Sequence, residues 1–123
     1  LMMQQKKPKD YVIATGKQYT VRDFIIQSAK TLGFEIKFKG RGIKEVGYIS
    51  KINKKSAEHL KIGQIIIKID QAYFRPSEVD SLLGDSSLAK KELKWKTNYN
   101  FKDLIKEMIN FDLNEISKIK KYD

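Results

Sequence analysis

Alternation of apolar and polar residues predicts the strands of this chain. In residues 34–39 the apolar side chains stand at every second position, which is the period of a β-strand with one buried face. Residues 65–70 form a β-branched apolar run that is typical of a strand. Shorter apolar runs at residues 11–14 and 45–49 predict two further strands. We expect the strand at 34–39 to pair near the one at 11–14.

A helical spacing of apolar residues marks two longer stretches. In the first, Thr20 is placed as an N-cap, with Asp23 three residues later and Gly33 as a C-terminal cap. In the second, Asn100 precedes apolar residues that recur at helical spacing from 101 to 116. We expect the apolar stripe of this final helix to cover the small sheet.

A shorter helix is predicted over residues 86–93, with Asp85 as its cap. Its expected buried side chains are Leu88, Ala89 and Leu93. Together the elements predict an α/β fold, in which a few short strands are covered by about three helices. We expect residues 1–123 to form one lobe, with residues 1–9 as the end of an incoming helix and a connector. The polar stretch 50–63 is expected to be a loop or a hairpin excursion.

Composition narrows the kinds of site that are possible. The chain contains no cysteine, which excludes disulfides and thiolate metal sites, and its one histidine, His59, has no second imidazole with which to chelate a metal. We therefore assign His59 to the surface. No apolar run approaches the roughly 18–20 residues of a membrane span, and no secretory signal is recognisable. We expect a cytoplasmic protein with no membrane partner.

The net charge of +10 is typical of proteins that bind nucleic acid, because clustered lysines and arginines neutralise phosphates. The lysines are instead spread along the chain and mixed with acids, which argues against a nucleic-acid partner. The one basic and aromatic cluster is Lys94-Trp95-Lys96. Its tryptophan could serve as a stacking platform for a base, or pack as a core anchor after the helix, and we favour the core anchor.

The stretch from 73 to 84 carries the strongest chemical signal. Pro76 pushes Arg75 into extended backbone, and Ser77 can cap the turn that contains Glu78. Arg75 offers a planar fork of donors suited to a phosphate, and Glu78 can accept hydrogen bonds from a pair of sugar hydroxyls. The pattern therefore predicts a site for a diphosphate and a ribose. The two side chains could also simply pair with each other on the surface.

Two further arginines are weaker candidates for the same ligand. Arg22, in the first turn of the predicted helix after Thr20, could point toward a bound phosphate or be a solvated surface residue. Arg41, at the tip of the Gly40-Arg41-Gly42 loop, could reach a ligand phosphate or remain a free surface arginine.

A set of short blocks in this order and spacing resembles the C-terminal part of the GDP-mannose 4,6-dehydratase family, which is a branch of the extended short-chain dehydrogenases/reductases. The resemblance covers nearly the whole chain. The blocks are residues 10–16, 21–24, 42–47, 70, 73–80, 83–85, 89–90 and 93–95.

The resemblance implies a fold and a function. The chain would be the substrate-binding lobe, with the Rossmann half absent. The parent reaction would convert GDP-mannose to GDP-4-keto-6-deoxymannose, with NADP bound by the missing N-terminal half and no cofactor on this chain. Arg75 would contact the diphosphate and Glu78 the ribose, and the full enzyme would be a homo-oligomer.

The sequence departs from the family pattern in several ways. It has no glycine-rich dinucleotide motif and no Tyr-x-x-x-Lys pair, so we expect a fragment that is inactive by itself. Ser77 replaces a common Thr, and Lys94 replaces a common Gly, which removes the residue that most easily adopts a positive φ before Trp95. Two alternatives stay open: a non-catalytic nucleotide-binding or interaction module, and a basic nucleic-acid-binding domain.

Overall fold

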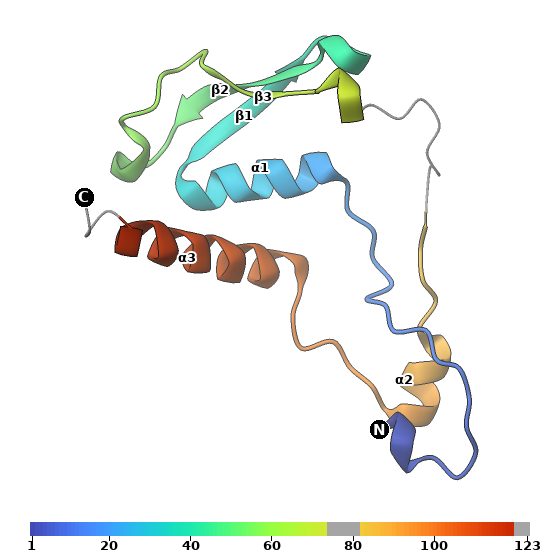
Figure 1. Cartoon of the computed structure of the whole chain (residues 1–123). Helices are drawn as coiled ribbons and strands as arrows, with labels where there is room; N and C mark the ends of the chain where they lie inside the picture. The colour runs from blue at the N-terminus through green and yellow to red at the C-terminus, as the bar shows by residue number, and fades with distance from the viewer. Residues whose placement is uncertain (74–81, 120–123) are drawn as a thin grey trace. The chain divides into compact units, whose positions relative to one another are not determined.

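The structure is a computed structural model of the chain, and it describes residues 1–73 and 82–119. The chain divides into two compact units (Figure 1). Unit 1 contains Leu1–Tyr19 and Glu78–Asn100, and unit 2 contains Thr20–Ser77 and Phe101–Asp123. No described helix is both long enough and apolar enough to span a membrane.

Helix α1 of unit 2 spans Val21–Leu32, and its sequence fixes both ends. The Thr20 side chain accepts a hydrogen bond from the Asp23 backbone N–H, and the Asp23 carboxylate accepts one from the Thr20 backbone N–H in return. This is a capping box, which satisfies two of the amide groups left free at a helix start. Gly33 ends the helix in the left-handed region, at φ 100°. The predicted helix and both of its caps are confirmed.

Unit 2 also contains a three-stranded antiparallel sheet in the order β1-β2-β3. Its strands are β1 Phe34–Lys39, β2 Val46–Ile52 and β3 Ile65–Lys68. The strands predicted at 34–39, 45–49 and 65–70 are therefore confirmed. Because β2 extends to Ile52, the predicted polar excursion is shorter than expected and forms the connection between β2 and β3.

The core of unit 2 lies between the sheet and α1. Ile49 is fully buried, and Phe34, Ile36 and Ala29 of α1 are nearly so. Burial of a side chain such as Ile49 stabilises a fold by about 1.5–3 kcal/mol. The charged residues that alternate with the apolar ones on β1 are left to the other face of the sheet, as the period of two requires.

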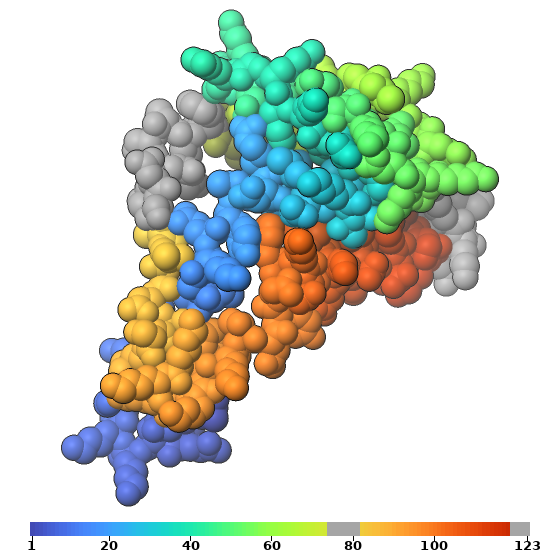
Figure 2. All heavy atoms as spheres, turned by 180° about the vertical axis from the view of Figure 1, so that it is seen from behind, coloured from blue at the N-terminus to red at the C-terminus, as the bar shows by residue number. Residues whose placement is uncertain are grey.

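Helix α3, Phe101–Ile119, forms the third layer of unit 2. It packs against α1, which in turn packs against β1, and the rings of Phe24 and Phe101 lie 6.3 Å apart. Figure 2 shows the layers from behind, with the sheet in cyan to green, α1 in blue and α3 in orange to red. The prediction that α3 covers the sheet is wrong, because α1 occupies that place. Several apolar side chains of α3 consequently remain exposed.

Unit 1 is built around the short helix α2, Ser87–Leu93. The Asp85 carboxylate accepts a hydrogen bond from the Ser87 backbone N–H, so the predicted cap acts at the helix start, one residue later than expected. Ala89 and Leu93 are buried, as predicted. The predicted burial of Leu88 is wrong, since 42% of this residue is exposed. Trp95 follows the helix and is half-buried, which agrees with a packing role.

The segment at residues 11–14 forms no strand, and this prediction is also wrong. A strand needs a neighbour with which to pair, and β1 pairs with β2. The Tyr11 hydroxyl instead donates a hydrogen bond to Glu92 of α2 at 2.7 Å. Lys9 also donates to Glu92, at 2.7 and 2.9 Å from the two carboxylate oxygens. The N-terminal segment is therefore held by hydrogen bonds to one side chain of α2, that of Glu92, and not by a backbone ladder.

Candidate functional site

One end of the unit 2 sheet brings together the segments that carry Arg22 and Arg41. Val46 at the start of β2 is paired with Lys68 at the end of β3. The β1–β2 turn, which carries Arg41, and the chain that leaves β3 therefore lie at the same end of the sheet (Figure 1). The start of α1 lies there too, because Arg22 contacts both Phe38 and Glu45. We call this region the arginine end.

Arg22 is held in place by two neighbours. Its Nη2 donates hydrogen bonds to both carboxylate oxygens of Glu45, at 2.8 and 2.7 Å. Its guanidinium carbon lies 4.2 Å from the centre of the Phe38 ring, which is a cation–π contact. The Arg22 side chain is nevertheless 46% exposed. The guanidinium is thus fixed in direction and still open to solvent, with Glu45 as its partner in this structure.

Arg41 lies in the turn between β1 and β2 and is exposed. Gly40 before it has φ 94°, and an added Cβ there would lie 2.4 Å from the Lys44 carbonyl oxygen, so the tight turn requires glycine. Among the described residues, the Arg41 side chain has no hydrogen-bond or ion-pair partner. It is therefore available to an anion from solvent at the same end of the sheet as Arg22.

The two main candidates, Arg75 and Glu78, lie outside the described residues. The described chain before them leaves β3 in a turn, in which the Asp70 carboxylate accepts a hydrogen bond from the Ala72 backbone N–H at 2.9 Å. Tyr73, the last described residue before them, is 84% exposed and so does not belong to the core. The described chain thus leaves β3 at the arginine end.

The cations of the arginine end suit the binding of an anion. Lys39 adds a further cation, and its Nζ lies 5.4 Å from the centre of the Tyr48 ring. The described residues contain no group of three or more His, Cys, Asp and Glu side chains that could hold a metal ion. His59, which we assigned to the surface, is exposed. Arg22, Arg41 and Lys39 therefore make the arginine end a candidate site for an anionic group such as a phosphate.

The residues present do not fit a dinucleotide cofactor. Gly40-Arg41-Gly42 connects two antiparallel strands, β1 and β2. A dinucleotide motif instead follows a strand and opens a helix, whose N-terminus then faces the pyrophosphate. This loop is therefore not a dinucleotide-binding motif.

One residue of the arginine end was missed by sequence reasoning. We interpreted Glu45 only as the start of a strand, but it is the partner that fixes Arg22. The two residues are 23 positions apart, and no local pattern in the sequence joins them. They meet because β1 runs back along α1, so that the turn after β1, which carries Glu45, lies beside the start of α1.

Comparison with known proteins finds one family model and several relatives, all of which carry the same name. A sequence model of the family described as GDP-mannose 4,6 dehydratase matches residues 1–108. The GDP-mannose 4,6-dehydratases of Vibrio cholerae and Yersinia enterocolitica are 47% and 48% identical to it over 115 residues, which is 94% of this chain and 31% of each relative. The human GDP-mannose 4,6 dehydratase is 36% identical over 113 residues, or 92% of this chain and 28% of that protein.

The chain thus spans about a third of the length of the relatives that it matches, and the matched part is their C-terminal part. The match covers most of the residues of both units. This chain therefore belongs to the GDP-mannose 4,6 dehydratase family.

Proposed function

We propose that this chain is the C-terminal, nucleotide-sugar-binding part of a GDP-mannose 4,6-dehydratase, a lyase that converts GDP-mannose to GDP-4-keto-6-deoxymannose. The observation that carries the proposal is the identity of 47–48% with two bacterial dehydratases over 94% of the chain. The gathering of arginine-bearing segments at one end of the sheet supports a site for a phosphate-bearing ligand there.

In this proposal Arg75 binds the diphosphate of GDP-mannose and Glu78 binds the ribose. Arg41, which is exposed, and Arg22, at the start of α1, would add further positive charge for the same ligand. A hydrogen bond to a charged group is worth about 1.5–3 kcal/mol. Binding energy from such groups orients the sugar at the reacting centre, so these residues serve catalysis without transferring a proton or a hydride.

The reacting groups belong to another part of the enzyme. NADP, which supplies the hydride chemistry, is held by an N-terminal dinucleotide-binding part and by no residue of this chain. The chain alone therefore binds nucleotide without turnover. The complete enzyme acts in the cytoplasm as a homo-oligomer, and neither a membrane nor a nucleic acid is among its partners.

Calorimetric titration of the purified chain with GDP and GDP-mannose tests the proposal, with circular dichroism to confirm folding. Saturable binding is expected, and Arg75→Ala should weaken it about tenfold or more, the equivalent of one charged hydrogen bond. Lys61→Ala, which removes one positive charge from the exposed β2–β3 connection, is the matched control and should bind as the unsubstituted chain does. Unchanged GDP binding in Arg75→Ala would contradict the assignment of this residue.

A titration with RNA at two salt concentrations distinguishes the proposed nucleotide-sugar site from a nucleic-acid-binding site. A basic nucleic-acid-binding domain would show an affinity that falls steeply with salt and does not depend on Arg75. Weaker binding of RNA than of GDP is expected instead. A folded chain that binds neither ligand would assign the nucleotide site to surfaces that form only with the N-terminal part.

A further inference from the structure

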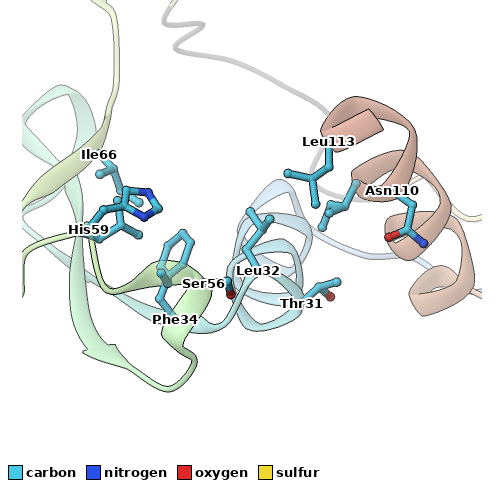
Figure 3. A pocket seen from close by; sticks show the side chains of 11 residues that line it. Thr31, Leu32, Phe34, Ser56, His59, Ile66, Asn110 and Leu113 are labelled. Carbon is cyan, nitrogen blue, oxygen red and sulfur yellow. The ribbon is translucent and has the colours of Figure 1, made fainter. Parts of the chain in front are cut away.

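Unit 2 contains a pocket that the proposed nucleotide site does not use. Its volume is about 430 Å³, and it lies between the β2–β3 connection, the end of α1 and the second half of α3. Figure 3 shows Leu113 and Asn110 of α3 on one side of the cavity and His59, Ile66 and Phe34 on the other, with Leu32 of α1 between them.

The lining is apolar and carries no Lys, Arg, Asp or Glu among the described residues. Its walls are formed mainly by Leu32, Phe34, Leu60, Ile66, Ile109 and Leu113. Thr31, one of the few polar residues, already uses its hydroxyl to bond the Gln27 carbonyl oxygen at 2.9 Å. A diphosphate or a sugar needs charged or convergent polar groups, so this lining favours an apolar occupant.

The pocket is remote from the arginine end. Arg22 lies in the first turn of α1, and Thr31 and Leu32 of the pocket lie in its last turn. At 1.5 Å per residue, the rise of the helix from Arg22 to Thr31 is about 14 Å. The pocket is thus a second surface of unit 2, with a different chemistry.

Apolar side chains around the mouth of the pocket are open to solvent. Leu113 is 51% exposed, Ile116 one turn farther along α3 is 52% exposed, and Ile66 of β3 is 39% exposed. The outer face of β1 offers no comparable surface, because it carries Glu35, Lys37 and Lys39. Leu113 and Ile66 line the pocket, so its walls carry apolar area that is open to solvent, as interaction sites often do.

We propose that this pocket is the socket in which the remaining part of a family polypeptide docks, through an apolar side chain inserted between α3 and the β2–β3 connection. The relatives contain about twice as much additional chain as is matched here, which must pack against the matched part to make one enzyme. Contacts between parts of one chain need a surface of roughly 600–1,500 Å², with apolar anchors seated in pockets. This proposal shares one assumption with the proposed function, namely that the chain is one part of a longer dehydratase.

Cysteine labelling tests the docking, because the chain has no cysteine of its own. Leu113→Cys places a thiol at the pocket, and Asn114→Cys places one on an exposed neighbouring position of α3 that does not line it. Both variants are made in the 123-residue chain. They are also made in a fusion in which the preceding part of the Vibrio cholerae relative, with any cysteine in it replaced by alanine, is placed before Leu1.

Maleimide should label the cysteine at 113 at least about tenfold more slowly in the fusion than in the separate chain, whereas the cysteine at 114 should react equally in both. The same protection is required when the chain is mixed with the preceding part made separately, so that a poorly folded fusion does not decide the result. Equal labelling at 113 in both experiments would overturn the proposal.

Two other occupants give distinct results. Protection of the cysteine at 113 in the separate chain that increases with protein concentration would assign the pocket to a second copy, and a small molecule seen by native mass spectrometry would assign it to a ligand. Either result overturns the proposal. GDP titration of the same samples reports on the nucleotide site independently, so loss of GDP binding with retained protection would reject only the proposed nucleotide site.

Discussion

Arg22 and Glu45 are joined by two hydrogen bonds, of 2.8 and 2.7 Å, although 23 positions separate them in the sequence. The pair links the start of α1 to the turn before β2, and the Phe38 ring supports it from one face. Both side chains are partly exposed, at 46% and 22%, so solvent screens their attraction. The pair therefore orients the guanidinium more than it stabilises the fold.

Replacement of Glu45 tests this view. Glu45→Gln should lower the free energy of unfolding by no more than about 1 kcal/mol, because partly exposed ion pairs contribute little. Urea denaturation measures the change, and it should shrink at high salt. Glu58→Gln is the control, since Glu58 is exposed and its side chain has no partner among the described residues. A loss of several kcal/mol specific to Glu45→Gln would show a structural role that we do not assign to the pair.

The same variant tests whether the arginine end binds the diphosphate. Glu45 places a negative charge beside Arg22, and this charge opposes a bound diphosphate. Its removal should tighten GDP binding by about 0.5–1 kcal/mol, the scale of one partly exposed charge pair. Isothermal titration of Glu45→Gln and Glu58→Gln measures the difference. Equal GDP affinities of the two variants would show that the diphosphate does not bind beside Arg22.

A side chain at Gly33 is expected to lower the free energy of unfolding, because of both the backbone conformation and a steric conflict. Its φ is 100°, and an added Cβ would lie 2.6 Å from the Cβ of Lys54. Gly63 has φ 85° and open space within 4 Å of the same position, so it isolates the backbone effect. Gly63→Ala should cost about 1–2 kcal/mol, and Gly33→Ala should cost a further 1–3 kcal/mol, roughly, from the steric conflict. Equal losses in urea denaturation would mean that Lys54 moves aside without strain.

Lys94 is the only non-glycine residue with a positive φ, 54°, in the described chain. It ends α2 in the left-handed region. Lys94→Gly should raise the stability of unit 1 by about 0.5–1 kcal/mol, because glycine adopts this conformation without steric cost. Lys91→Gly, within α2, should instead cost about 1 kcal/mol. Urea denaturation followed by the fluorescence of Trp95, the one tryptophan, compares the two variants. A destabilised Lys94→Gly would contradict the prediction.

The pH dependence of unit 1 should depend on Glu92. Hydrogen bonds from Lys9, and then from Tyr11, lower the pKa of the Glu92 carboxyl below its ordinary value of 4.5. Its stabilising contribution is therefore present above pH 4.5 and is lost as the pH falls through the lower pKa of the folded state. Hydrogen bonding to Glu92 raises the pKa of Lys9 and of Tyr11 above 10.5 and 10.0, so their contributions are lost only as the pH rises beyond those values.

Glu92→Gln should make the free energy of unfolding of unit 1 less dependent on pH in both the acid and the alkaline range. Denaturation followed by Trp95 fluorescence between pH 3 and pH 5, and again above pH 10, measures them, at fixed ionic strength. The control is Glu107→Gln, on the exposed face of α3 in unit 2. An acid limb that stays equally steep in Glu92→Gln would show that other carboxylates determine the acid sensitivity of unit 1.

The elements whose signals are local were predictable from the sequence. The capping box of Thr20 and Asp23, the terminal Gly33 and the alternation along β1 each act within a few residues, so their patterns determine the structure directly. The strand expected at residues 11–14 was wrong because β-branched residues need a pairing partner, which the sequence does not name. The predicted packing of α3 on the sheet was wrong because an apolar stripe shows which face of a helix is buried, but not which element of the fold covers that face.

The candidate site was predictable only in part. Arg22 was found at a helix start and Arg41 in a turn. The strand register places the turn, and the hydrogen bonds of Arg22 to Glu45 place the helix start, at the same end of unit 2. The partnership of Arg22 with Glu45 depends on how β1 returns along α1, which no short motif encodes. The roles of Arg75 and Glu78 remain predictions, since these residues lie outside the described part of the chain.

The strand order has a consequence for aggregation. Among the described strands, β1 and β3 form the two edges of the sheet. Charged residues on β1, such as Lys37 and Lys39, oppose pairing with the edge of another molecule, whereas Ile65 and Ile66 of β3 are apolar and 43% and 39% exposed. The short length of β3 limits how far such pairing can extend. A concentrated preparation of the chain should therefore associate through β3, and a charged residue placed on that strand would act as a gatekeeper against fibrils.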